Sequence, residues 1–174
     1  MKYEVVNIDT WERGNLFRFY IDNLRNVMSM TVDMNVTNLI EYIHIHRLKF
    51  YPSMMWVISK VINTHDEFKF SWDKSGSLIH WDYISPYYAD FHKEDNRFVK
   101  LVTEYSDDLF EFHARFLTDR ERYKTLRAFD LTNIPANTFD VSCLPCVNYP
   151  WGFLLLSPRV IFCYCGIFTA PTSL

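Results

Sequence analysis

Hydrophobic positions in the first part of the chain predict a helix followed by a strand. Over residues 11–24 apolar side chains recur along one side of a helix, and Asp9 and Thr10 precede them as candidate caps. Gly14 weakens the first turn of this helix by up to about 1 kcal/mol relative to alanine. Residues 29–37 then alternate strictly between apolar and polar side chains, which predicts a half-buried strand.

Two further helices are predicted around a proline. The first begins at Thr37 or Asn38 and runs to about residue 46. Pro52 then interrupts the chain, because the residue before a proline disfavours the helical conformation, and Ser53 caps a helix over 54–63. Since that helix is apolar around most of its surface, we predict that it is buried.

The remaining pattern predicts strands and one long helix. Residues 68–72 and 78–83 flank the turn-forming sequence 73–76, an arrangement typical of a β-hairpin. Two more strands are expected over 87–92 and 98–103, an amphipathic helix over 107–124, a loop at Pro135 and Asn137, and a short strand over 139–144. The chain is therefore predicted to form one α+β domain around a largely antiparallel or mixed sheet.

The charge pattern changes abruptly near Pro150. Arg159 is the only charged residue in 151–174, whereas the preceding part of the chain is about one quarter charged. Three explanations compete: a final pair of strands, a segment that touches a membrane, or out-of-frame sequence after a frameshift. We favour the third, and expect a partial domain over 1–149 and a divergent apolar segment over 150–174.

Composition narrows the class of protein. Aromatic residues make up 18% of the chain, and such side chains often line pockets for flat or apolar ligands. The net charge of −3 and the absence of a basic stripe argue against nucleic acid as a partner. No signal pattern begins the chain, and no run reaches the roughly 18–20 apolar residues that a membrane span needs. We therefore expect a cytoplasmic protein without a membrane partner.

The four cysteines could in principle bind a metal. Cys143, Cys146, Cys163 and Cys165 form C-x2-C and C-x-C pairs. The second spacing fits structural zinc sites poorly, and neither pair has a glycine-rich turn. Buried thiols of a reducing compartment are the better explanation, and no metal is expected.

Several motifs in order resemble the chloramphenicol acetyltransferase family. They are Trp11-x-Arg13-x3-Phe17-x-Phe19-Tyr20, Ser29-Met30-Thr31, Lys49-Phe50-Tyr51-Pro52, His65-Asp66-Glu67-Phe68, Phe91-His92-x5-Phe98, Glu121-Arg122-Tyr123 and Val141-Ser142-x-Leu144-Pro145. The resemblance implies that family's mixed sheet with flanking helices, incomplete here in its C-terminal part. It also implies homotrimers whose active sites lie between subunits, with the base from one subunit and much of the antibiotic pocket from its neighbour.

The resemblance further implies acetyl transfer from acetyl-CoA, a co-substrate and not a tightly bound cofactor, to a hydroxyl of chloramphenicol. A histidine acts as the general base, and a hydroxyl donor stabilises the tetrahedral oxyanion. By position, Ser142 is the expected oxyanion-side donor. Tyr20, Leu24 and Phe98 match residues that line the antibiotic pocket.

Two further positions carry over with changes. Met28 lies where the family usually places an aromatic residue against the drug, and its flexible thioether would pack a ring less specifically. Arg13 matches an arginine that fixes the site through an ion pair with the aspartate after the catalytic histidine. Cys146 replaces the tryptophan that normally follows Leu-Pro.

The family signature His-His-x3-Asp-Gly is absent from these residues, and no histidine follows His113. The histidines present have no partner that the sequence identifies, and geometry must come first for a general base. We therefore expect a chloramphenicol acetyltransferase-family chain with little or no activity alone. The alternatives are a non-catalytic module that assembles with intact subunits, and an acyltransferase for a different acceptor, as Met28 suggests.

Overall fold

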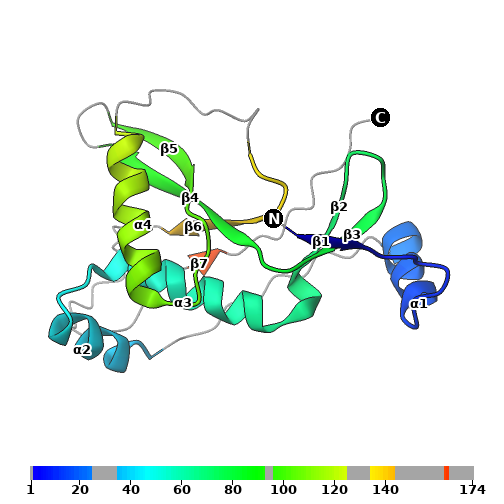
Figure 1. Ribbon diagram of the computed structural model, residues 1–174, viewed down its shortest axis with the longest axis horizontal. Coiled ribbons are helices and arrows are strands. Elements are labelled where there is room, and N and C mark those ends of the chain that lie inside the picture. Colours follow the sequence, from blue (N-terminus) through cyan, green and yellow to red (C-terminus); the bar gives the residue numbers. More distant parts are fainter. Residues whose placement is uncertain (1, 25–34, 93–95, 125–133, 144–162, 165–174) are drawn as a thin grey trace, which may run out of the picture.

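The computed structural model describes residues 2–24, 35–92, 96–124, 134–143 and 163–164. Within them the strands form a three-stranded sheet of order β1-β3-β2 and a four-stranded arrangement of order β5-β4-β6-β7. Figure 1 shows the smaller sheet and α1 toward one end and the larger sheet under α4 toward the other. The α+β fold class is as predicted, with the strands divided between two sheets.

The smaller sheet is built on the predicted hairpin. β2 spans Phe70–Trp72 and β3 spans Leu78–Trp81, and they pair antiparallel. Gly76 takes a φ of 80° in the turn, a conformation that glycine adopts at little cost. The Asp73 carboxylate accepts hydrogen bonds from the backbone N–H groups of Ser75 and Ser77. The turn chemistry of 73–76 therefore predicted the hairpin correctly.

β1, which spans Tyr3–Val5, adds to this sheet by pairing antiparallel with β3. This strand was not predicted, because alternation over only three residues does not identify a strand, and all three residues are exposed.

The first helix begins later than predicted. α1 spans Gly14–Phe19 and continues as a π-helix, η1, over Tyr20–Leu24. Neither Asp9 nor Thr10 caps it, since the residue before the helix is Arg13 and no side chain caps its first turn. Gly14 is buried there, and a Cβ at this position would lie 1.9 Å from the Ile8 carbonyl oxygen. The glycine that weakens the helix is therefore required by a close backbone approach.

The second and third helices are present with shifted starts. α2 spans Thr37–Ile45, so Thr37 does not belong to the predicted strand, of which residues 29–34 lie outside the described residues. α3 spans Phe50–Thr64 and begins before Pro52. A proline in the first turn is tolerated because its missing N–H would have no helical partner. Ser53 is consequently not a cap, and its hydroxyl donates to the Lys49 carbonyl at 2.8 Å.

α3 is only partly buried, which corrects the prediction of a buried helix. Met54 and Met55 are fully enclosed, but Val61 is 53% exposed. Ser59 on the same helix is buried, and its hydroxyl is satisfied there because it donates to the Met55 carbonyl at 2.7 Å. A buried serine with its hydrogen bond satisfied within the helix looks polar in sequence and belongs to the core face. A short 3-10 helix, η2, follows over Asp66–Phe68.

The larger sheet carries the second half of the chain. β4 spans Ser85–His92 and pairs antiparallel with β5, which spans Arg97–Val102. β6 spans Thr138–Cys143 and lies parallel to β4, while β7, Cys163–Tyr164, pairs antiparallel with β6. The strands predicted over 87–92, 98–103 and 139–144 are therefore confirmed to within a few residues. The rest of the apolar segment 150–174 lies outside the described residues.

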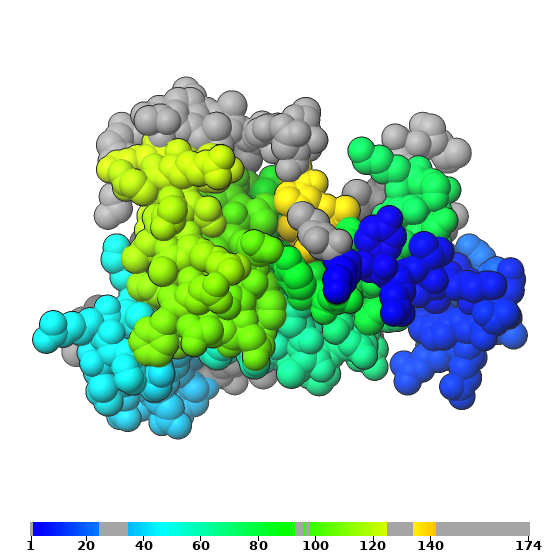
Figure 2. Space-filling model, viewed as in Figure 1, coloured from blue at the N-terminus to red at the C-terminus, as the bar shows by residue number. Residues whose placement is uncertain are grey.

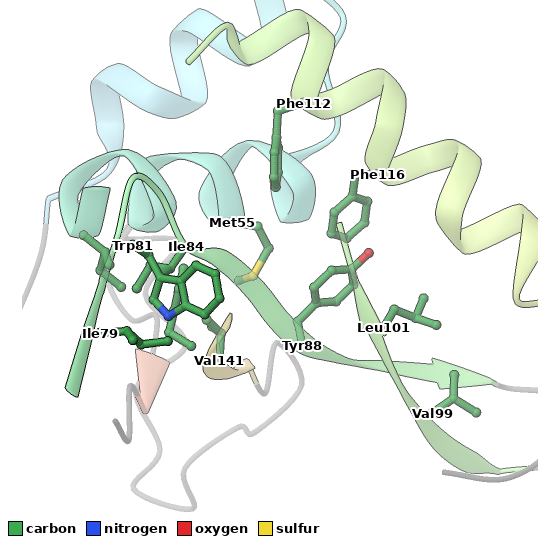
Figure 3. Packing of buried hydrophobic residues seen from close by; sticks show 12 residues of the cluster. Met55, Ile79, Trp81, Ile84, Tyr88, Val99, Leu101, Phe112, Phe116 and Val141 are labelled. Carbon is green, nitrogen blue, oxygen red and sulfur yellow. The ribbon is translucent and has the colours of Figure 1, made fainter. Parts of the chain in front are cut away.

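α4, Leu109–Arg122, covers this sheet together with α3 (Figures 1 and 3). The Asp108 carboxylate caps it by accepting from the Glu111 backbone N–H at 2.7 Å. Phe112 and Phe116 from α4 are fully buried, and the ring of Phe116 stacks on that of Tyr88 with centroids 4.5 Å apart. Figure 3 shows this stack between helix and sheet, beside Met55 of α3.

A buried hydrogen-bond chain runs beneath α4. The hydroxyls of Tyr88 and Thr103 are 2.9 Å apart, and the Thr103 hydroxyl donates to the Asp119 carboxylate at 2.8 Å. Tyr88 and Thr103 are both fully buried. Burial raises the pKa of the Tyr88 phenol far above its ordinary value. The chain joins β4, β5 and α4 with each buried hydroxyl satisfied.

Candidate functional site

Tyr20 and Leu24, the expected acceptor-binding residues near the N-terminus, lie on η1 and face solvent. Tyr20 is 47% exposed and Leu24 is 43% exposed, and Leu16, Phe19 and Ile21 of the same segment are exposed to similar degrees. We call these five residues the α1 apolar face. Met28, expected to contact the drug, lies outside the described residues.

Phe98 and Ser142 lie in the larger sheet. Phe98 is 46% exposed on β5 and packs against Phe91 of β4, with ring centroids 4.9 Å apart. The backbone of Ser142 lies in β6, one residue beyond the paired Tyr88 and Val141. Ser142 therefore belongs to the strand beside β4, and Phe98 to the strand on its other side.

The chain does not bring these residues together in one pocket. Figure 1 places α1 at one end of the molecule and β5 toward the other, with α3 running along the length between them. Figure 2 shows the residues of α1, in blue, at that end of the molecule. One copy of the chain therefore presents Tyr20 and Phe98 on distant surfaces.

Arg13, the expected partner of a distal aspartate, lies beside a different acid. Its guanidinium Nη1 is 3.7 Å from Glu67 Oε1, and both side chains are more than 60% exposed. A pair of this kind contributes between nothing and about 1 kcal/mol in water. Arg13 therefore remains near the surface beside α1, with little to hold it in one geometry.

His113 has a structural role. It is buried on α4, and its Nε2 accepts a hydrogen bond from the Lys49 backbone N–H at 2.9 Å, just before α3 begins. Burial is the main cause that lowers the pKa of His113, and the neighbouring Lys49 charge adds to it. An imidazole whose acceptor nitrogen is occupied in this way cannot take a proton from a substrate without losing that bond.

The other histidines are likewise engaged or exposed. His92 is buried with its Nε2 4.0 Å from Asp90, and His80 Nε2 lies 3.7 Å from Asp66. His46 packs against the rings of Tyr42 and Phe110, His65 packs against Phe68, and His44 is exposed. Across the described residues, no histidine lies against both an expected acceptor residue and a carboxylate that would orient it.

A groove of about 890 Å³ that the sequence did not indicate runs between α4 and strands β4 and β5. Its walls carry charges of both signs, and these charges pair: Arg115 Nη2 lies 2.6 Å from Glu111 and its Nη1 lies 3.7 Å from Glu104. Burial raises the pKa of Asp119 on its wall, partly offset by the donating Thr103 hydroxyl. The polar side of the helix over 107–124 was the only sequence signal for this groove, and none of the expected site residues lines it.

Within the described ranges, no group of three or more histidine, cysteine, aspartate or glutamate side chains is placed to hold a metal ion. Of the helices that the structure describes, none combines the length and the apolar character needed to cross a bilayer.

Comparison with known proteins explains the motifs found in the sequence. A family model described as chloramphenicol acetyltransferase matches residues 1–170, and so extends over most of the apolar segment. A chloramphenicol acetyltransferase of Clostridium butyricum is 36% identical over 156 residues, which cover 89% of this chain and 71% of that protein. Chloramphenicol acetyltransferase 3 of Escherichia coli is 33% identical over 150 residues, 86% of this chain and 70% of that protein.

The fold agrees with these matches. A solved chloramphenicol acetyltransferase superposes with a TM-score of 0.61 at 16% identity, covering 82% of this chain and 81% of that one. At this identity the likeness concerns the fold alone, while the family model and the curated relatives carry the assignment. The chain belongs to the chloramphenicol acetyltransferase family.

Proposed function

We propose that this chain carries the acceptor-binding residues of a chloramphenicol O-acetyltransferase but supplies no general base within its 174 residues, and that alone it turns over little or no substrate. The observation that carries the proposal is the set of its histidines. His-His-x3-Asp-Gly does not occur, and His113, the last histidine, accepts a backbone hydrogen bond. Loss of general-base catalysis typically costs 10²–10⁴-fold in rate.

The proposed chemistry follows that of the family. In an intact site the base removes the proton of a chloramphenicol hydroxyl, whose oxygen attacks the thioester carbon of acetyl-CoA. The carbon–sulfur bond then breaks, and the released thiolate of CoA takes up a proton. Ser142 is proposed to donate to the oxyanion formed in between.

The two acceptor surfaces are proposed to meet across copies of the chain. Tyr20 with the α1 apolar face and Phe98 with Phe91 present apolar rings at opposite ends of one copy. Two different surfaces that bind each other make a head-to-tail contact, and such contacts close into rings when the rotation permits. A homotrimer with its sites between subunits is the assembly that we propose.

Chloramphenicol binding tests the acceptor part of this proposal. Equilibrium dialysis with labelled chloramphenicol should detect binding to the purified chain, and Tyr20→Ala should weaken it. Phe110→Ala provides a matched control, because Phe110 is 45% exposed on α4 and packs on His46. Absence of binding by the unsubstituted chain would overturn the acceptor assignment.

A second candidate function is a non-catalytic assembly module. The exposed apolar residues at both ends favour it, since exposed apolar patches mark interaction surfaces. Co-expression with the Clostridium butyricum relative distinguishes this module from the first candidate function. The particles are separated by size-exclusion chromatography, and the activity of those that contain both chains is measured. Mixed trimers would support the module, and complete separation of the two chains would remove it.

The apolar segment 150–174 is proposed to result from a change of reading frame near Tyr149, although the family model also extends over residues 150–170. The sharp loss of charged residues supports this, and Cys146 in place of the family's tryptophan shows that departure begins earlier. The coding sequence tests it directly. A second frame that encodes His-His-x3-Asp-Gly downstream of the Tyr149 codon is expected, and its absence from both other frames would contradict the proposal.

A further inference from the structure

α1 is too short to hold its own position. It spans Gly14–Phe19 and continues for one further turn as η1. Isolated helices shorter than about 12–15 residues are marginal in water, so tertiary packing decides where such a helix lies. The placement of Tyr20 and Leu24 therefore depends on what α1 packs against.

Aromatic rings join α1 to the hairpin. Trp11, just before the helix, stacks on Phe70 of β2 with centroids 5.3 Å apart. Phe17 of α1 packs against Trp72 of β2 at 5.9 Å and against Trp11 at 5.6 Å. We call these four side chains the aromatic clamp. Each ring is half-buried, so the clamp forms a satellite cluster apart from the main core.

The clamp acts together with a fixed backbone contact. The Gly14 backbone approaches the Ile8 carbonyl so closely that no Cβ fits between them. Glycine sets how near the helix comes at its first turn, and the clamp sets its rotation one turn later. The ion pair of Arg13 with Glu67 adds little because both groups are exposed.

The clamp and the acceptor residues share one short segment. Phe17 and Tyr20 are three residues apart, and side chains at this spacing are neighbours on a helix. A shift of Phe17 therefore moves Tyr20 directly. Among the ring contacts of the described residues, Trp72 has Phe17 as its one partner, whereas Phe70 also packs against His80.

We propose that Trp72, acting through Phe17, is a positioning residue that sets the orientation of Tyr20 and Leu24 for the acceptor. This inference rests on the proposed function, because it concerns the same acceptor surface. It assigns to the hairpin a role in acceptor affinity, although Trp72 itself lies outside the α1 apolar face.

Two measurements test this role. In Trp72→Ala, the backbone amides of residues 14–24 should exchange hydrogen faster than in the unsubstituted chain, and those of β4 and β5 should exchange at the same rate. Equilibrium dialysis should show chloramphenicol binding weakened about threefold to tenfold, the factor that one aromatic pair corresponds to. Trp72→Phe should restore both, since a smaller ring still reaches Phe17, and Phe110→Ala should alter neither.

The outcomes separate the positioning role from the proposed function. Unchanged exchange over residues 14–24 in Trp72→Ala would overturn the positioning role, whatever the binding. Faster exchange with unchanged chloramphenicol affinity would overturn it too, because the clamp would then be merely structural. If the unsubstituted chain does not bind chloramphenicol, the acceptor assignment fails, and hydrogen exchange still decides whether Trp72 places α1.

Discussion

The two ends of the molecule are built differently. Around β4, β5, α3 and α4, fully buried residues such as Tyr88 and Phe116 pack ring on ring, and the buried hydroxyls of Tyr88 and Thr103 are hydrogen-bonded. Around α1 and the small sheet, half-buried rings meet across a short helix whose other apolar residues face solvent. The proposed acceptor residues occur at both ends, so one half of the proposed pocket is firmly placed and the other depends on a few contacts.

The largest expected contrast concerns two phenylalanines. Phe116→Ala should lower the free energy of unfolding by about 3–5 kcal/mol, the usual cost of removing a fully buried ring. Phe17→Ala, in the aromatic clamp, should cost clearly less, because its ring is only half-buried. Urea denaturation of both variants measures the difference. Equal losses of unfolding free energy would mean that the two ends are equally well packed.

A smaller contrast concerns two threonines. Thr103→Val removes the hydroxyl between Tyr88 and Asp119 and leaves a buried phenol without its partner, which should cost about 1–3 kcal/mol. Thr10→Val, at the exposed turn before α1, should cost less than about 0.5 kcal/mol. Thermal unfolding of the two variants checks this. A neutral Thr103→Val would show that the buried chain contributes nothing.

The smallest expected effect is a pH dependence of the larger core. The pKa of His113 is lowered on folding, so the unfolded chain binds its proton more readily. Its contribution to stability should be complete above the ordinary histidine pKa of about 6.5 and should be lost as pH falls below it. The difference in stability between the chain and His113→Gln, followed from pH 7.5 to pH 5, measures it. A difference that grows as pH falls would have the wrong sign.

The sequence predicted regular elements well where a single local signal decides them. The turn of residues 73–76 follows from local hydrogen bonding and the helix over 107–124 from its amphipathic pattern, and both the hairpin and the long helix are present. The first residues of two helices differ from the prediction. α1 begins at Gly14, where the helix backbone packs closely on the Ile8 carbonyl. α3 begins before Pro52, because a proline fits the first turn of a helix. β1 was missed because its three residues are too few for alternation to indicate a strand.

The candidate site was predictable only through the family motifs. Tyr20, Leu24 and Phe98 are exposed apolar residues, and nothing in periodicity distinguishes them from Leu16 or Val61. Their distance from one another depends on the three-dimensional arrangement of α1 and β5. The ion pair of Arg13 with Glu67 was also unforeseen, because an exposed pair of this kind leaves no pattern in the sequence.

Acetyl transfer by the purified 174-residue chain tests the central claim most directly. Its rate with acetyl-CoA and chloramphenicol should be compared with that of the Clostridium butyricum relative under the same conditions. We predict a rate at least 10²–10⁴-fold lower, the usual cost of a missing general base. A rate within about tenfold of the relative, a smaller loss than a missing general base typically causes, would contradict the account and require a base among the histidines present.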